Sequence, residues 1–247
     1  MRRIKITLAY DGTNYHGWQV QPGRVTIQSE LQRVVSEIEE NPVAVHGSGR
    51  TDAGVHALGQ VAAFSIANPI PCDNLRRAIN RLLPHDIRVL AVDEAAPDFH
   101  PRYAARRKTY EYRIQCSESC SPFERLYVHH HPYPLNIENM IAVAPVLEGE
   151  HDFSAFSAAD EKDALDRSKV RYIWSSQLEQ QSSLLVYRVT GSGFLKHMVR
   201  NIVGVLLEAG KSNVDRAGME ARLTPGCHIP TGPTAPARGL FLVSVEY

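Results

Sequence analysis

The stretch from His46 to Phe64 reads HGSGRTDAGVHALGQVAAF and joins a charged, glycine-rich loop to an apolar segment. Within the loop, Arg50 and Asp52 lie two residues apart. Glycine accepts positive φ and lets another backbone or a ligand approach closely, and loops on a rigid scaffold often carry reactive groups. A hairpin turn with a surface ion pair, worth under about 1 kcal/mol, is the simpler interpretation. That interpretation gives no reason for Thr51 and His56 to lie beside the pair, so the loop is a candidate reactive site.

Around this loop, hydrophobic periodicity predicts the elements of the first half of the chain. Their expected order is strand, helix, strand, strand, helix, strand, at 4–10, 26–38, 42–46, 60–66, 75–83 and 87–92. Thr26 can cap the first helix, and Pro84 should end the second. In this order the loop of Arg50 and Asp52 joins the two central strands.

The second half of the chain repeats this order of elements, without repeating the sequence. Strands are expected at 109–114, 170–178, 184–190 and 241–245, and helices at 137–147, 194–208 and 215–223. Pro145 should kink or shorten the helix that contains it. The pattern predicts an α+β protein of two ferredoxin-like (split βαβ, RRM-like) domains with antiparallel sheets, spanning residues 1–105 and 106–247. Such a topology hosts many functions and by itself indicates none.

Composition excludes several classes of protein. The 27 basic and 27 acidic residues balance, so any nucleic-acid-binding surface must be a local one. The four cysteines form no Cys-x-x-Cys pair, and the side chains of the contiguous histidines 129–131 should fan apart, so we predict no metal site. No Walker or dinucleotide-binding motif is present, which predicts no cofactor. The chain begins with an alternating strand pattern and has no apolar run of about 18 residues, which predicts a soluble, cytoplasmic protein without a membrane span.

One segment has a local charge excess. Between residues 100 and 113 five basic side chains face a single Glu111, a net +4, and three tyrosines are interleaved; the basic residues are Arg102, Arg106, Arg107, Lys108 and Arg113. Cations neutralise phosphates and aromatic rings stack on unpaired bases, which favours RNA binding. A solvated strand edge with its tyrosines in the core is an equal alternative, and one of Tyr110 and Tyr112 should be a core residue only. The predicted helix from Phe194 should place Lys196, His197, Arg200 and Asn201 on a second face, which would extend a basic cleft.

Three blocks of the chain together resemble the tRNA pseudouridine synthase A family. They are the segment 10–19, which reads YDGTNYHGWQ, the segment 49–61, which reads GRTDAGVHALGQV, and the segment 99–112 with Phe99-His100-x-Arg102-Tyr103 and Tyr110-x-Tyr112. Later blocks that match in order are Asp152-Phe153-x-x-Phe156, residues 197–204 (HMVRNIVG) and residues 239–242 (GLFL). The resemblance spans nearly the whole chain, and the block from Arg50 to Gln60 is highly specific. Two departures are Pro145, where the family usually continues a helix, and the charged insertion Ala158 to Asp166.

The resemblance implies a fold, an activity and partners. It implies two ferredoxin-like domains with a catalytic cleft between them, the first carrying the catalytic loop and the second completing the cleft and supplying the interface of a homodimer. It implies that uridines 38, 39 and 40 of the tRNA anticodon stem-loop are isomerised to pseudouridine, without a cofactor. Asp52 takes the position of the catalytic nucleophile and Arg50 stands beside it. We expect tRNA to be bound by Tyr110, Arg102, Arg106, Arg107, Lys108 and Arg200.

The reaction suits these residue types. Isomerisation breaks the N1–C1′ bond, turns the uracil over and joins C5 to C1′, and a carboxylate can act as covalent catalyst. Attack on C6, attack on C1′ and removal of a sugar proton all stay open. Arg50 should keep Asp52 ionised and can fill the space of a base taken out of the stack. A free tyrosine, with a pKa of about 10, is a poor base at neutral pH, so packing on the uracil is the expected role of Tyr110.

Two other classes of function remain possible on the sequence. One is a non-catalytic RNA-binding module of paired RRM-like domains, although the aromatic-rich signatures of such modules are missing. The other is a pseudouridine synthase of the same family that acts on other RNAs.

Overall fold

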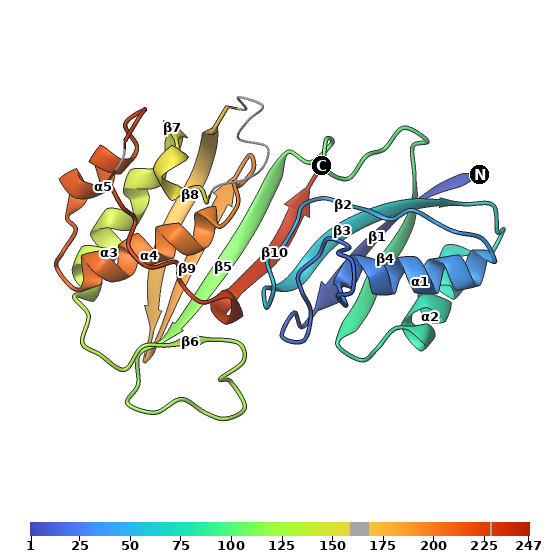
Figure 1. The fold of residues 1–247 in the computed structure, drawn as a ribbon, viewed down its shortest axis with the longest axis horizontal. Helices are drawn as coiled ribbons and strands as arrows, with labels where there is room; N and C mark the ends of the chain where they lie inside the picture. Colours follow the sequence, from blue (N-terminus) through green and yellow to red (C-terminus); the bar gives the residue numbers. More distant parts are fainter. Residues whose placement is uncertain (159–167, 228) are drawn as a thin grey trace. The chain divides into compact units, whose positions relative to one another are not determined.

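The computed structural model describes residues 1–158, 168–227 and 229–247 (Figure 1). The chain forms two compact units: unit 1 comprises Met1–Arg106 and Phe241–Tyr247, and unit 2 comprises Arg107–Leu240. The insertion of Ala158 to Asp166 lies, apart from Ala158, outside the described residues. No helix among the described residues is long and apolar enough to cross a membrane.

Unit 1 contains a sheet with two helices. Its elements in chain order are β1 (Arg2–Tyr10), α1 (Ile27–Glu39), β2 (His46–Gly47), β3 (His56–Ile66), α2 (Cys72–Leu82), β4 (Ile87–Ala95) and the larger part of β10 (Leu240–Glu246). β1 lies between β4 and β3, antiparallel to both. The other edge of β3 is shared, because antiparallel β2 pairs near Ala62 and parallel β10 pairs near His56. The sheet is therefore mixed, and the prediction of purely antiparallel sheets is wrong for this unit.

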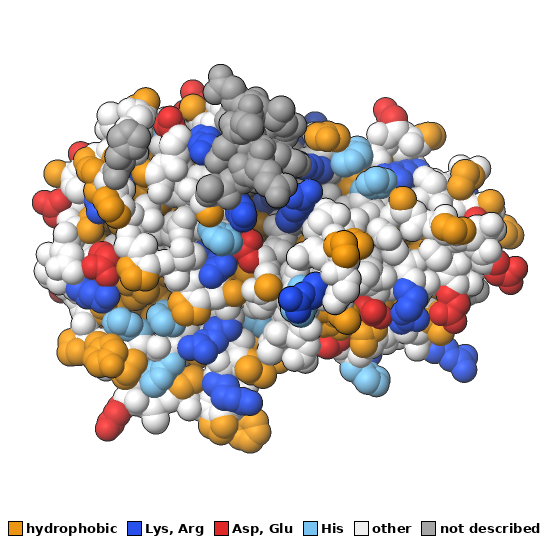
Figure 2. All heavy atoms as spheres, viewed as in Figure 1, with side chains coloured by type: hydrophobic (Ala, Val, Ile, Leu, Met, Phe, Trp, Pro, Cys, Tyr) orange, Lys and Arg blue, Asp and Glu red, His pale blue; other side chains and the backbone are white. Residues whose placement is uncertain are grey.

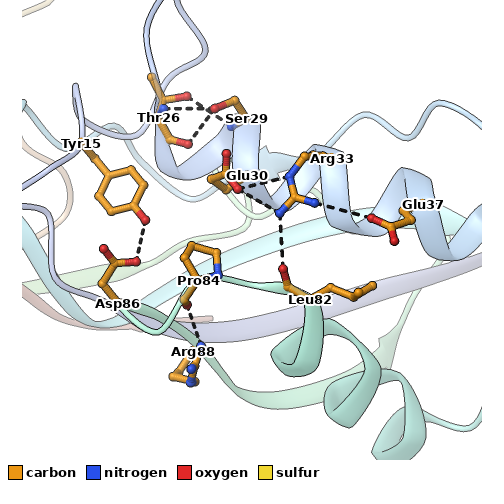
Figure 3. A network of polar contacts seen from close by, with 10 residues as sticks. All are labelled: Tyr15, Thr26, Ser29, Glu30, Arg33, Glu37, Leu82, Pro84, Asp86 and Arg88. Atoms are coloured by element: carbon orange, nitrogen blue, oxygen red, sulfur yellow. Dashed lines mark hydrogen bonds and ion pairs between the residues drawn. The ribbon is translucent and has the colours of Figure 1, made fainter.

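Local sequence signals account for most of unit 1. The alternating residues of β1 place Ile4, Ile6 and Leu8 in the core with none of their surface exposed. Thr26 caps α1, with its hydroxyl accepting from Ser29 N and Ser29 Oγ accepting from Thr26 N. As Figure 3 shows, Arg33 on α1 donates to the carbonyl of Leu82 at the end of α2 (3.3 Å), so the two helices are tied to each other. The predicted order of elements is confirmed in this unit.

The strand predicted at 42–46 is largely absent. Only His46 and Gly47 pair as β2, although Val43 and Val45 are buried. Side chains of α1 explain the difference: Ser36 Oγ accepts from Val43 N (2.9 Å), and Gln28 Nε2 donates to Val45 O (2.7 Å). These backbone groups are thus satisfied without a strand partner. The loop of Arg50 and Asp52 therefore joins a two-residue edge strand to β3, and does not join two central strands.

The main strands of unit 2 are hydrogen-bonded in the order β5-β9-β8-β7. Its elements are β5 (Arg107–Gln115), β6 (His129–His130), α3 (Ile137–Val143), β7 (Gly149–Asp152), β8 (Val170–Gln181), β9 (Leu184–Gly191), α4 (Met198–Gly210) and α5 (Arg216–Arg222), with 3-10 turns at Ala144–Leu147, Ser154–Phe156 and Ala237–Gly239. Neighbours in this order are antiparallel, while the short β6 is parallel to β5. The strand pairs of this unit are therefore also a mixture of parallel and antiparallel.

Two helices of unit 2 bear on the sequence predictions. The helix containing Pro145 does end early, because α3 stops at Val143 and Pro145 lies in a 3-10 turn. The helix predicted from Phe194 begins only at Met198, since His197 adopts a left-handed conformation with φ 61°. Lys196 and His197 therefore precede α4, and their prediction as part of a helical face is wrong. Met198, Ile202, Val205 and Leu206 of α4 are buried in the core.

Candidate active site

The loop that carries Asp52 is fixed through its backbone by a second loop, residues 11–18, which follows β1. The Trp18 amide donates to the carbonyl of Thr51 (3.0 Å), and the Gly54 amide donates to the carbonyl of Tyr15 (3.3 Å). In addition, the Val55 amide donates to the carbonyl of Asp52 (3.1 Å), and this hydrogen bond closes a turn that begins at Asp52. Asp52 thus sits between anchored peptide units.

Glycines make this close approach of the two loops feasible. A Cβ on Gly12 would stand 2.0 Å from the carbonyl oxygen of Val55, and one on Gly17 would stand 2.4 Å from that of Thr51. Gly17 also has φ +80°, a conformation that L-residues rarely adopt. The segments 10–19 and 49–61 are therefore two halves of one assembled loop pair.

His56 closes the far end of this loop pair. Its side chain is 1% exposed and stacks on Phe241 of β10, with ring centroids 4.8 Å apart. Its Nδ1 lies 3.1 Å from the amide of Gly12, which donates to it, and 3.1 Å from a carboxylate oxygen of Asp11. His56 is thus a buried polar link between the two loops, and this gives a structural reason for its place beside Asp52.

Asp52 and Arg50, the predicted catalytic pair, differ in their exposure to solvent. Asp52 is half-buried, whereas Arg50 is exposed. Arg50 Nε donates to Oε1 of Gln19 (3.2 Å), the residue that directly follows the second loop. Both side chains therefore belong to the pair of loops, and the carboxylate stands on the better-anchored backbone.

Of the predicted tRNA-binding residues, unit 1 holds Arg102 and Arg106, both exposed. The Arg102 guanidinium lies 6.0 Å from the ring centre of Tyr103, and the Arg106 amide donates to the carbonyl of Glu246 (2.8 Å). His100, with its ring 4.4 Å from Tyr103, adds to this group. In Figure 2 basic and acidic side chains are mixed over the face of unit 1 that is shown, so its cations are not segregated there.

Unit 2 holds the other predicted tRNA-binding residues, Arg107, Lys108, Tyr110 and Arg200. Arg107 is exposed and stacks over Trp174, 4.7 Å from the ring centre. Tyr110 is 7% exposed, and its ring meets that of Phe194 edge-on at 5.0 Å. Tyr110 is thus mostly buried, and Phe194 is one of the side chains that enclose it.

Three polar side chains of unit 2, those of Arg200, Tyr112 and Asn201, stabilise the fold by donating hydrogen bonds to backbone carbonyls. Arg200 on α4 donates through Nε to the carbonyl of Ala235 (2.7 Å). Tyr112 is fully buried and donates to the carbonyl of Pro236 (2.8 Å), which confirms that one of the two β5 tyrosines is a core residue. Asn201 is buried and donates to the carbonyl of Phe156 (2.8 Å), so it does not contribute to a solvated face.

Among the described residues, no group of three or more His, Cys, Asp and Glu side chains is placed to hold a metal ion. Burial, together with neighbouring basic groups, lowers the pKa of His129 to about 4. His130 lies with Nε2 2.9 Å from the carbonyl of Ser117.

Comparison with known proteins adds the observation that decides the family. A model of the tRNA pseudouridine synthase family matches residues 6–104 and 143–247. The chain is 61% identical to tRNA pseudouridine synthase A of Solibacter usitatus, over 100% of both chains. The chain belongs to the tRNA pseudouridine synthase A family. It is also 42% identical to the enzyme of that name from Limosilactobacillus reuteri, over 100% of this chain and 97% of the relative. A match to a chain of a solved Cbf5-Nop10-Gar1 complex covers 82% of this chain and 54% of that chain, at 13% sequence identity. Its TM-score is 0.33, so this match does not bear on the fold.

Membership of the tRNA pseudouridine synthase A family makes the protein an isomerase, as the sequence predicted. The family match covers both loops of the assembled pair, since residues 10–19 and 49–61 fall within its first segment. Tyr10 and Gln60 also contact the Asp52 loop, although the sequence did not predict it: the Tyr10 hydroxyl lies 2.9 Å from Thr51 Oγ1, and Gln60 Nε2 donates to the carbonyl of Gly49 (3.1 Å). The sequence did contain a signal for such contacts. The glycine-containing segments 10–19 and 49–61 each adjoin a predicted strand, and two such segments can meet at one end of a sheet.

Proposed function

We propose that this protein isomerises uridines 38, 39 and 40 of the tRNA anticodon stem-loop to pseudouridine, with Asp52 as the catalytic nucleophile. The observation that carries the proposal is the fixed backbone on both sides of Asp52 in a chain of this family. The Thr51 carbonyl is held by Trp18, and Gly54 is held by Tyr15. A reactive carboxylate gains from such fixation because rates depend steeply on placement.

The chemistry requires one group that forms and later releases a bond. The N1–C1′ bond breaks, the uracil turns over, C5 joins C1′, and the proton lost from C5 is balanced by one gained at N1. No electron is gained or lost overall. A carboxylate serves as covalent catalyst at C6 or at C1′, or as the base that removes a sugar proton. Asp52 supplies this carboxylate in each of the three routes.

The other predicted site residues have supporting roles in this proposal. Arg50 is exposed and held by Gln19, so its guanidinium stands ready to pair with a carboxylate or to occupy the space of an extruded base. Tyr110 packs on the uracil, and its edge contact with Phe194 keeps its ring in place. Arg200 contributes positive charge near β5, the strand that carries Tyr110. Its charge is close enough to oppose the rise that burial causes in the pKa of Tyr112, on the same strand.

The fold and location complete the proposal. In unit 1 the strand order β4-β1-β3-β2, with two helices, is that of a split βαβ, ferredoxin-like domain. We assign residues 1–105 to the domain that carries the Asp52 loop and residues 106–247 to the domain that supplies Tyr110, although the last segment, Phe241–Tyr247, is part of compact unit 1. No cofactor is required, and the cytoplasm, which contains tRNA, is the expected location.

The proposed activity is tested by incubating the protein with unmodified tRNA transcripts and mapping pseudouridine. Conversion at positions 38, 39 and 40, with none elsewhere, is the expected result. Pseudouridine in a different RNA and none in the anticodon arm would favour a family member with another substrate. Tight RNA binding with no conversion of any RNA would favour a non-catalytic binding module.

A first prediction concerns the basic stretch. The triple change Arg106→Ala, Arg107→Ala and Lys108→Ala should weaken tRNA binding. It should also reduce the magnitude of the slope of log affinity against log salt by about 2 to 3, because each lost phosphate contact removes up to about 0.9 from that slope. Salt titrations of binding measure this slope. The matched control is Arg76→Ala, Arg77→Ala and Arg81→Ala on α2, which removes the same charge. Equal slopes for the two triple variants would show that only net charge matters.

A second prediction concerns assembly. We expect a two-fold homodimer in which the tRNA body lies partly on the subunit opposite the active Asp52, since one subunit with zero net charge offers a short basic track. Exposed apolar side chains on one side of β8, namely Val170, Tyr172 and Trp174, are available for an interface. Light scattering at the assay concentration should give about twice the mass of 27.6 kDa. A monomer under these conditions would contradict the expectation.

A further inference from the structure

Four hydrogen-bonded polar side chains are buried in the Asp52 loop and in the strands beside it. They come from three parts of the chain: the end of β1, the loop itself and β3. Tyr10 is 4% exposed, Thr51 7%, and Ser48 and Gln60 0%. Buried polar groups cost free energy unless they are hydrogen-bonded, and apolar residues would fill the same space more simply. Packing alone therefore does not explain why these four residues are polar.

Gln60 is the centre of this group. Its Oε1 accepts from Ser48 Oγ (2.6 Å) and from the Val61 amide (3.2 Å). Its Nε2 donates to the carbonyl of Gly49 (3.1 Å) and, at the longer distance of 3.5 Å, to the hydroxyl of Tyr10. One amide side chain on β3 thus holds two residues of the loop and one residue of β1.

Tyr10 connects Gln60 to Thr51, the residue before Asp52. Its hydroxyl lies 2.9 Å from Thr51 Oγ1. Either oxygen can donate in this contact, and the phenol oxygen also accepts an N–H from Gln60, so the Tyr10 hydrogen is available to Thr51. Burial raises the pKa of Tyr10 to about 12, so this hydrogen is retained at neutral pH. Thr51 is thereby held on its side chain by Tyr10 and on its carbonyl by Trp18.

We propose that Tyr10 and Gln60 are positioning residues of the isomerisation, acting through Thr51 to hold the Asp52 carboxylate where it reacts. The inference rests on the proposed role of Asp52. Thr51 is the covalent neighbour of Asp52, so a shift of its peptide moves the carboxylate directly. Misplacement of a reacting group by about 1 Å can cost about 100-fold in rate. The group of hydroxyls and the amide supplies directional contacts that an apolar filling would not.

The proposal predicts a selective loss of turnover. Tyr10→Phe and Thr51→Val should each lower kcat by about 10- to 100-fold, with KM and tRNA affinity within about 2-fold of wild type. Thr51→Ser keeps the hydroxyl and should restore most of the rate. The double variant Tyr10→Phe/Thr51→Val should lose no more than either single variant, because both remove the same contact.

A matched control exists in unit 2. Tyr187 is likewise fully buried, with its hydroxyl 2.9 Å from Ser176 Oγ. Tyr187→Phe therefore removes an equivalent buried hydroxyl and should lower the thermal stability to a similar degree while leaving kcat within about 2-fold. The comparison separates loss of stability from loss of placement.

Single-turnover and steady-state assays of these variants, alongside Asp52→Asn, test the inference. A kcat for Tyr10→Phe that falls no further than that for Tyr187→Phe would overturn it, as would additive losses in the double variant. If Tyr10→Phe fails to fold, the pair Thr51→Val and Thr51→Ser decides, and equal rates for these two would overturn the proposal. Full activity of Asp52→Asn would instead refute the proposed catalytic role of Asp52, so the two failures are distinguishable.

Discussion

Replacement of Asp52 by asparagine is expected to lower turnover by at least about 10⁴-fold, as the loss of a central catalytic side chain does in other enzymes. Asparagine keeps the size of the side chain but cannot form the covalent bond or accept a proton. Because the backbone of the loop is held by Thr51, Gly54 and Val55, the variant should keep its fold. Its thermal midpoint and its affinity for tRNA should stay close to those of wild type.

Mapping of pseudouridine over long incubations measures this loss, with tRNA binding and thermal unfolding followed in parallel. Asp93→Asn is the matched control, since Asp93 is an exposed carboxylate of unit 1 in a 3.4 Å ion pair with Lys5. An exposed pair contributes about 0 to 1 kcal/mol, so this variant should be fully active. Appreciable turnover by Asp52→Asn would remove Asp52 from the catalytic role.

Local signals in the sequence were sufficient for the elements that they specify. The alternation from Ile4 to Tyr10 predicted β1, and Thr26 predicted the start of α1 through its side-chain contact with the Ser29 amide (3.2 Å). Pro145 predicted the early end of α3. Each of these features depends on residues within a few positions of one another, and such contacts leave a readable pattern.

Contacts between distant residues left no such pattern. The strand predicted at 42–46 was lost because Gln28 and Ser36 take up its backbone groups. The parallel pairing of Phe241 with His56 joins positions far apart in the chain and could not be read from periodicity. The start of α4 at Met198 depends on the left-handed His197, a conformation that no residue type there indicated.

The candidate site shows the same division. Glycine content and charge marked the loop of Arg50 and Asp52, and the family resemblance named the nucleophile. The partner of that loop became visible only where the structure placed Gly12 against Val55 and Gly17 against Thr51. Burial then revealed Gln60, whose polarity on an apolar strand was the one local hint of its contacts.

Substitution of Gly17 by alanine should lower both stability and turnover, because two costs fall on one residue. A left-handed conformation at φ +80° costs a non-glycine residue about 1 to 2 kcal/mol. The added Cβ would stand 2.4 Å from the Thr51 carbonyl oxygen and 3.0 Å from the carbonyl carbon of Asp52, so the two loops must part. Overpacking of this kind costs about 1 to 3 kcal/mol more. We expect a total destabilisation of about 2 to 5 kcal/mol and a fall in kcat of about 100-fold.

Two other glycines separate these costs. Gly23 has φ +69°, but a Cβ added there would meet nothing within 4 Å, so Gly23→Ala should lose stability alone and keep its turnover. Gly12 has ordinary φ, yet its Cβ would lie 2.0 Å from the Val55 carbonyl oxygen, so Gly12→Ala should lose turnover through displacement of the loop. Thermal unfolding and kcat for the three variants give the comparison. If kcat tracks stability across all three, the placement of Asp52 does not depend on the paired loop. If Gly12→Ala and Gly17→Ala lose turnover well beyond Gly23→Ala, the first loop acts as the support on which the carboxylate is set.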